Sequence, residues 1–250
     1  MEWYIYLEVV FVGLMAGFIN TLAGGGSALS LPLLIFLGLP PTIANGTNRI
    51  AILLQTATAS GSFKKEKVLD LKKSWPIGIA ALAGAIPGAL FAVHLNEFIM
   101  RKVIGFILII VLLLVIFKPE IWIKSREGVK DKQTNWISYL VFFFIGAYGG
   151  FIQVGIGFFL LSGLVLVEGL DLLKANAIKS FIVLIYTPLA LLIFILNDQV
   201  DFKLGLILAL GNVTGAWIGS KLAVSWGTKF IRWVLLIALT GSILKLFEVY

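Results

Sequence analysis

Long runs of hydrophobic residues, separated by short polar stretches, occupy most of this 250-residue chain. A helix that crosses a bilayer needs about 20 predominantly apolar residues, and several of the runs reach that length. Lipid tolerates no open sheet edge, and the runs lack the strict alternation of barrel strands, so we expect each run to be helical. The expected full spans are residues 3–23, 42–60, 74–95, 98–117, 136–154, 172–196, 202–224 and 228–247.

Two further apolar runs are too short to cross a membrane upright. Residues 27–39 would form a helix of roughly 20 Å, and residues 157–167 would form a shorter one. The triplet Gly24, Gly25 and Gly26 interrupts the chain before the first of these runs, and a second glycine-rich stretch precedes the other. The sequence therefore predicts an all-α polytopic membrane protein with glycine-broken short helices, and about 8–10 membrane helices or half-helices in total.

The two halves of the chain resemble each other at an offset of 131 residues, which becomes 133 near the start of each half. The matches follow the same order as the hydropathy pattern, so we infer an internal duplication. The repeats would be residues 1–118 and 136–250, joined by a cytoplasmic linker loop at 119–135. The matching pairs include Gly13 and Gly146, Asn20 and Gln153, Gly38 and Gly169, Asn45 and Asn176, Asp70 and Asp201, Gly84 and Gly215, and Gly88 and Gly219.

Loop charge predicts that the repeats have inverted topology. The loop at 61–73 holds five Lys, whereas its partner at 197–203 holds one Lys and two Asp. Basic residues concentrate in cytoplasmic loops, so these equivalent loops should lie on opposite faces of the membrane. We therefore expect both termini outside and a multi-pass protein of the cell inner membrane. Inverted repeats with interrupted helices are typical of secondary transporters whose substrate binds near the midplane.

Composition narrows the function further. The chain is 60% hydrophobic and only 13% charged, which excludes a soluble enzyme or a disordered chain. It has no Cys and one His, so we predict no metal and no cofactor. The net charge of +7 suits cytoplasmic loops better than a nucleic-acid surface, and no nucleic-acid partner is expected. An intramembrane enzyme lacks support, because the one His lies at the end of a span and no paired Asp is present.

Polar and charged side chains gather at the glycine-rich breaks and near the start of a later helix in each half. Arg49 and Lys179 place positive charge in apolar surroundings without a deep carboxylate to neutralise either one. Unpaired cations in a bilayer are costly and are functional suspects by default. Free N–H groups at helix breaks also favour anions. The predicted substrate-binding residues are Asn20, Gly24, Gly25, Gly26, Asn45, Thr47, Asn48, Arg49, Gln153, Asn176 and Lys179.

Each of these residues also has a structural interpretation that the sequence leaves open. The glycines could form a tight turn between close-packed helices, and the two cations could snorkel to headgroups. Asn45 and Asn176 could cap helices, and buried amides could bond neighbouring helices. The small-residue pairs Gly84 with Gly88 and Gly215 with Gly219 predict helix packing inside the monomer, with a dimer seam as the alternative.

The order of motifs resembles a known family. In the first half, Gly13, Gly17 and Phe18 lead to the glycine triplet, Gly38-Leu39-Pro40 and the stretch 44–49. This order is similar to the first signature of the TauE/SafE family of sulfite and organosulfur-anion transporters, and residues 146–157 with 174–179 resemble its second signature. The resemblance implies movement of sulfite, sulfonates such as sulfoacetate, or related small carboxylates across the bacterial inner membrane.

Together these observations predict a secondary transporter that exports a small anion, such as sulfite, a sulfonate or another organosulfur compound, by alternating access. Its partners would be the anionic substrate and the lipid bilayer. The oligomeric state stays open, and a homodimer is compatible with the sequence. The alternatives are an anion channel and a small-carboxylate transporter.

Overall fold

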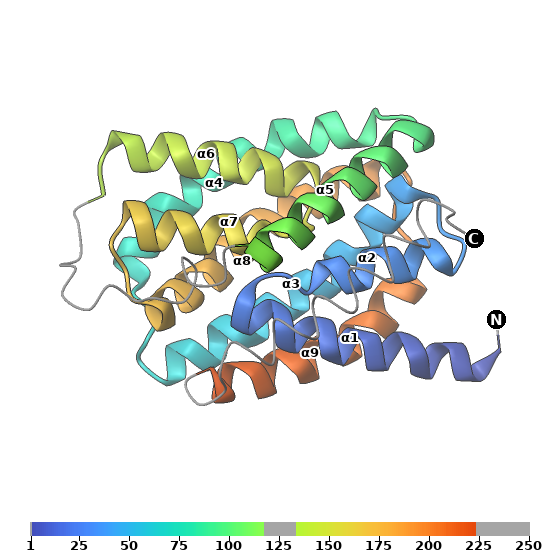
Figure 1. Cartoon of the computed structure of the whole chain (residues 1–250), viewed down its shortest axis with the longest axis horizontal. Coiled ribbons are helices and arrows are strands. Elements are labelled where there is room, and N and C mark those ends of the chain that lie inside the picture. Colours follow the sequence, from blue (N-terminus) through green and yellow to red (C-terminus); the bar gives the residue numbers. More distant parts are fainter. Residues whose placement is uncertain (1, 118–133, 224–250) are drawn as a thin grey trace.

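The computed structural model describes residues 2–117 and 134–223, and all the regular structure in those residues is helical. The helices lie side by side along the longest axis of the molecule (Figure 1). The elements are α1 (Trp3–Ala23), α2 (Ser27–Phe36), α3 (Pro41–Lys65), α4 (Leu71–Val93), α5 (Glu97–Phe117), α6 (Trp136–Phe151), α7 (Ile156–Ser162), the π-helix η1 (Gly163–Val167), α8 (Leu172–Leu196) and α9 (Phe202–Leu222).

The predicted spans agree well with these helices. The bounds of α1 and α8 are the predicted ones, and both predicted short runs form short helices after a break. Several boundaries were wrong: α2 and α6 each end three residues before the predicted limit, and α4 begins three residues earlier than predicted. The largest difference is in α3, which continues to Lys65, five residues into the predicted basic loop, because Gly61 and the polar residues after it extend the helix beyond its apolar part. The predicted span at 228–247 and the linker at 119–133 lie outside the described residues.

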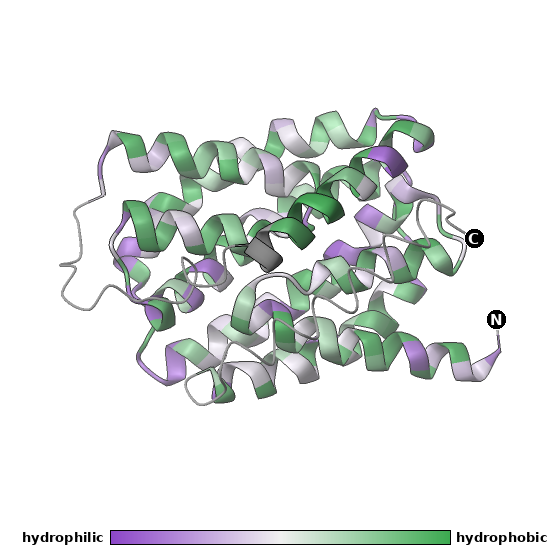
Figure 2. Ribbon diagram, in the orientation of Figure 1, coloured by the Kyte–Doolittle hydropathy of each residue, from purple (hydrophilic) through white to green (hydrophobic). Residues whose placement is uncertain are grey.

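Hydropathy along the described helices is that of a membrane protein. Four of them, α1, α4, α8 and α9, are long and apolar enough to cross a membrane. Hydrophobic residues predominate along most helices in Figure 2, and large apolar side chains such as Phe11, Phe106 and Leu210 are exposed on the outside. The more polar α3 lies against α8 and α9 and is mostly buried. The chain is therefore an all-α membrane protein whose polar helix is covered by apolar ones.

Small residues allow two helix pairs to approach at backbone distance. Gly84 and Gly88 of α4 lie against α6, where a Cβ at Gly84 would stand 1.9 Å from the carbonyl oxygen of Phe143. Gly215 and Gly219 of α9 lie in the same way against α1. The predicted packing of these glycines within the monomer is confirmed. The predicted duplication pairs α1 with α6 and α4 with α9, so under that prediction the two contacts would be one contact formed twice.

Backbone conformation repeats at the offset found in the sequence. Six described residues have a positive φ, and they form three pairs whose members are 131 positions apart. Left-handed backbone is uncommon outside glycine, so coincidence is a poor explanation for three such pairs. The pairs are Gly24 (83°) with Gly155 (71°), Gly38 (96°) with Gly169 (69°), and Lys67 (58°) with Asp198 (54°).

Equivalent helices run in opposite directions in Figure 1, since α1 starts near the N-terminus at the right of the view and α6 starts at the left. The loop at 66–70 precedes the first residue of α4, whereas Gln199 donates a hydrogen bond to the carbonyl of Val93 at the last residue of that helix. The two equivalent loops therefore lie at opposite ends of the molecule. This is the arrangement that inverted repeats would give, although the faces of the membrane to which the loops belong stay a prediction.

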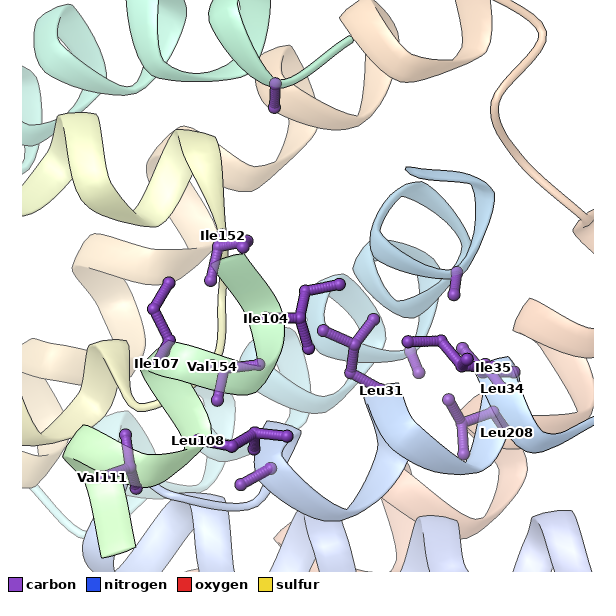
Figure 3. Close-up of a cluster of buried hydrophobic side chains, with 14 of the residues drawn as sticks. Leu31, Leu34, Ile35, Ile104, Ile107, Leu108, Val111, Ile152, Val154 and Leu208 are labelled. Carbon is purple, nitrogen blue, oxygen red and sulfur yellow. The ribbon is translucent and has the colours of Figure 1, made fainter. Parts of the chain in front are cut away.

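An apolar cluster closes the centre of the molecule on the side of α5. Figure 3 shows Ile104 and Leu108 of α5 beside Leu31 of α2, and beside Ile152 and Val154 in the segment that joins α6 to α7. All five side chains are almost completely buried. The non-helical backbone after α6 is thereby shielded by protein, which is the condition for irregular backbone at membrane depth.

Candidate functional site

The helix breaks of the two halves meet at backbone distance. Gly24 ends α1 in the left-handed conformation, and its N–H donates to the carbonyls of Ile19 and Asn20. A Cβ at Gly24 would stand 2.4 Å from the Cα of Gly157 in α7, and a Cβ at Gly157 would stand 2.1 Å from the Cα of Gly24. Only glycine permits such an approach. The breaks predicted from the two glycine-rich stretches therefore touch each other.

A small cavity lies beside this crossing. Its free space is no larger than about one water molecule requires. Both halves contribute to it, through α1, α2 and α3 on one side and through the break after α6, α7 and α8 on the other. The lining residues are Asn20, Ser27, Ile52, Gln55, Thr56, Gln153, Ile156, Gly157, Lys179, Ser180 and Val183.

A buried hydroxyl of the lining has no hydrogen-bond partner among the described residues. Ser27 Oγ lies in the cavity wall and forms no hydrogen bond with any of them. The first turn of α2, which begins at Ser27, also has no side-chain cap. Buried polar groups are nearly always satisfied, so such atoms indicate water or a ligand. The positive end of the α2 dipole adds a preference for negative charge.

Lys179 of α8 binds the carbonyl end of α1. Its Nζ donates to the carbonyl oxygens of Asn20 (2.9 Å) and Thr21 (3.1 Å) and to Oδ1 of Asn176 (2.7 Å). Asn176 itself donates to the carbonyl of Leu22 at 3.2 Å. The last carbonyls of a helix have no partner within the helix, and a cation there is favoured by the helix dipole. Lys179 is 3% exposed, and it also lines the cavity.

Arg49 of α3 binds the carbonyl end of α6, as Lys179 binds that of α1. Its Nη1 donates to the carbonyl of Gly149 (3.2 Å) and its Nη2 to that of Gly150 (2.5 Å), in the last turn of α6. The guanidinium lies 4.5 Å from the ring centroid of Phe194, which supports a cation–π contact. Asn45 donates to the carbonyl of Phe151 at 2.8 Å. Arg49 is fully buried and does not line the cavity.

The remaining predicted residues fall into two groups. Thr47 and Asn48 lie away from the cavity: the first accepts a hydrogen bond from the N–H of Asp201, and the second accepts one from the hydroxyl of Ser30. The glycine triplet belongs to the break, and a Cβ at Gly26 would collide with α1 at the carbonyl of Ala16. Of the eleven predicted residues, the structure places Asn20, Gln153 and Lys179 in the cavity wall. Gly24 and Gly25 belong to the break after α1, whereas Asn45, Arg49 and Asn176 lie within α3 and α8 and bond the carbonyl ends of α6 and α1.

Some lining residues were missing from the predicted set. Gln55 joins three helices, because its Oε1 accepts hydrogen bonds from Asn20 (3.3 Å) and from Asn212 of α9 (3.2 Å). Thr187, which lies outside the lining, accepts one from Gln153 at 3.2 Å. Their polarity inside apolar runs was a signal, and Gln55 lies six residues after Arg49 in the same helix. Nothing in the sequence could show that Asn212 reaches the same amide.

The described acidic side chains form no ion pair with either of the two buried cations, Arg49 and Lys179. Glu168, at the end of η1, is fully buried and lies 3.7 Å from Lys73 at the start of α4, where the hydroxyl of Thr134 also donates to it. In the described residues no ion pair joins Arg49 or Lys179 to a carboxylate, and no cluster of residues suited to a metal ion was found there. The positive charge around the cavity therefore has no protein counter-charge in the described part of the chain.

Comparisons with known proteins identify the family of the chain. The family model described as "Sulfite exporter TauE/SafE" matches residues 9–246, so the chain belongs to the TauE/SafE family of membrane transporters. It is 30% identical to a probable membrane transporter protein, ORF9, of Sinorhizobium sp. over 93% of this chain and 88% of that one. It is 29% identical to a probable membrane transporter protein of Haemophilus influenzae (90% and 88%) and 26% identical to YjnA of Bacillus subtilis (96% and 99%). No solved structure was found to match the chain.

Proposed function

We propose that this protein is a secondary transporter that exports a small anion, such as sulfite, a sulfonate or another organosulfur compound, across the inner membrane by alternating access. The observation that carries the proposal is the cavity at the crossing of the two helix breaks. It is lined by polar groups from both halves of the chain and has one buried ammonium in its wall. A cavity between repeats, next to broken helices, is where secondary transporters bind their substrates.

The chemistry of the lining favours a small anion. Lys179 supplies a positive charge, Ser27 supplies a free hydroxyl, and the amide nitrogen of Gln55 has no protein partner among the described residues. Hydrogen bonds to a charged group are stronger than those between neutral groups. In the conformation described here the cavity is too small for the anion, so binding requires the halves to separate. Loading and release would therefore follow movement of the repeats.

In this proposal the predicted residues have two different roles. Asn20 and Gln153 would meet the substrate from the cavity wall, and Lys179 would attract it by its charge, since its three N–H groups bond protein oxygens. Asn45, Arg49 and Asn176 would hold the carbonyl ends of α6 and α1 in place and so fix the shape of the site. Both termini would lie outside, since this places the lysine-rich residues 64–73 in the cytoplasm.

Binding by the purified protein tests the proposal. A ligand that binds only the folded state raises its melting temperature, so sulfite, thiosulfate, sulfoacetate, taurine, sulfate and small carboxylates would be compared. We expect one class of anion to stabilise the wild type. Ser27→Ala should weaken that binding by about threefold to tenfold, the value of one hydrogen bond of about 0.5–1.5 kcal/mol.

Ser60→Ala is the matched control. Ser60 Oγ is also buried and without a partner among the described residues, yet Ser60 does not line the cavity. Its substitution should leave anion binding unchanged. Absence of stabilisation by every anion, or equal effects of the two serine substitutions, would contradict the proposed site.

A further inference from the structure

The ammonium of Lys179 occupies a nest of neutral oxygens. Two are main-chain carbonyls at the end of α1, those of Asn20 and Thr21, and the third is Oδ1 of Asn176, all within 3.1 Å of Nζ. An ammonium has three N–H groups, so three acceptors satisfy it completely. We call these three oxygens the cation cradle.

The cradle has the chemistry of a site for a small monovalent cation. In transporters with broken helices, unwound carbonyls and the C-terminal ends of half-helices coordinate the coupling ion, Na⁺ or H⁺. Here two of the three oxygens lie at such a helix end, where the dipole is negative, and the place of the ion is taken by a side chain of the protein. The other half differs, because Arg49 covers the carbonyl end of α6 but does not line the cavity.

We propose that Lys179 is a built-in cation that fills the cation cradle in place of a coupling sodium ion and holds the charge that the transported anion neutralises. The inference rests on the proposed function, and it identifies Lys179 as the source of positive charge at the proposed anion site. Burying a cation without a counter-charge is costly, and no described carboxylate pairs with Lys179. An anion in the cavity would supply the missing charge next to it. Anion binding should then need Lys179 and should be indifferent to sodium.

The wild type gives the first test without any substitution. Anion-induced stabilisation should be the same in sodium chloride and in choline chloride at equal ionic strength, since choline is too large for three convergent oxygens at this spacing. A requirement for sodium would overturn the inference. A wild type that no anion stabilises would instead count against the proposed function.

Lys179→Ala empties the cradle and gives the second test. In choline chloride the variant should bind the stabilising anion at least about tenfold more weakly, because a hydrogen bond or charge contact of this kind contributes more than 1.4 kcal/mol. Adding methylammonium, ammonium or sodium chloride should restore most of the loss by filling the vacated cradle. Lys174→Ala, five residues earlier on α8 and paired with Asp171, is the control and should keep wild-type binding.

The cradle can also be tested without an anion. Methylammonium alone should raise the melting temperature of Lys179→Ala relative to choline, and should not raise that of the wild type, whose cradle is full. Failure of every small cation to stabilise Lys179→Ala, or unchanged anion binding by that variant in choline, would overturn the inference. If Lys179→Ala is unstable, anion binding in choline chloride is measured with Lys179→Met, which keeps most of the side-chain volume.

Discussion

At the scale of single residues, glycine decides whether the two halves can meet. Gly24 needs its left-handed conformation to end α1, and it needs the absence of a side chain to touch Gly157. Gly38 has a similar positive φ, but nothing lies within 4 Å of the place where its Cβ would be. A side chain at Gly38 would meet backbone strain alone, whereas a side chain at Gly24 would meet both backbone strain and a collision with Gly157.

Alanine at these two glycines should have unequal effects. Gly38→Ala adds only left-handed strain and should destabilise the protein by about 1–2 kcal/mol. Gly24→Ala adds the same strain and a collision with main-chain atoms that cannot rotate away, so we expect a loss of more than about 3 kcal/mol. Thermal unfolding in detergent measures both. Equal decreases in melting temperature would show that the breaks do not touch as described.

The contacts of Arg49 depend on the planar shape of its guanidinium as well as on its charge. Arg49→Lys keeps the charge but cannot bond two carbonyls and stack on Phe194 at once, so unfolding should become easier by about 1–3 kcal/mol. Lys65→Arg, at the exposed end of the same helix, is the control and should change stability by less than about 0.5 kcal/mol. A similar melting temperature for both variants would contradict the role assigned to Arg49.

At the scale of elements, each half begins its fourth helix in the same way. Asp70 starts α4 and accepts a hydrogen bond from the N–H of Lys73, and its equivalent Asp201 starts α9 and accepts one from the N–H of Leu204. A side-chain oxygen at this position satisfies one of the free N–H groups of the first turn. These caps stabilise the first turns of α4 and α9.

Removing either cap should have the same modest cost. We expect Asp70→Ala and Asp201→Ala each to lower the free energy of unfolding by about 1 kcal/mol. Glu66→Ala provides the comparison, because that exposed side chain follows α3 without capping a helix N-terminus, and its effect should stay within about 0.5 kcal/mol. Should the two Asp variants melt at the temperature of Glu66→Ala, the caps would have no energetic role.

Hydropathy and turn residues predicted most of the elements. Apolar length located α1 and α8 to the residue, and the glycine-rich stretches located both breaks. The π-helix η1 could not be predicted, because nothing in the sequence at Gly163–Val167 distinguishes it from an α-helix. The end of α3 was missed because its last turn is polar, whereas the prediction followed apolar residues.

The candidate site was predicted in outline only. Polarity within apolar runs singled out Asn20, Gln153 and Lys179, which the structure places in the cavity wall, and their contact with substrate stays a prediction. The bonds of Arg49 to Gly150 and of Lys179 to Thr21 could not be foreseen, because they join segments 101 and 158 residues apart. Only the packing of the two halves decides which carbonyls each cation reaches.

At the scale of the whole molecule, each half stabilises the other. The cation on α3 binds the end of α6, and the cation on α8 binds the end of α1, so each half supplies the partner for the broken helix of the other. The polar contacts lie at the crossing of the breaks, while apolar and small residues form the outer helix pairs. Movement of one half against the other would change the cavity first.

Topology can be tested with single cysteines, since the chain has none of its own. Glu66→Cys and Asn197→Cys occupy equivalent exposed positions in the two halves, 131 residues apart. A membrane-impermeant maleimide applied to intact cells should label Asn197→Cys and spare Glu66→Cys until the membrane is permeabilised. Labelling of both variants in intact cells would exclude inverted repeats.

Transport by the purified protein in liposomes tests the central claim most directly. Uptake of the anion that stabilises the protein should saturate with its concentration and should be accelerated by the same anion on the far side, because alternating access returns a loaded site faster than an empty one. Ser27→Ala should raise the concentration for half-saturation, and Ser60→Ala should not. Uptake that rises linearly without saturation would identify a channel instead, and no uptake of any stabilising anion would contradict transport through this cavity.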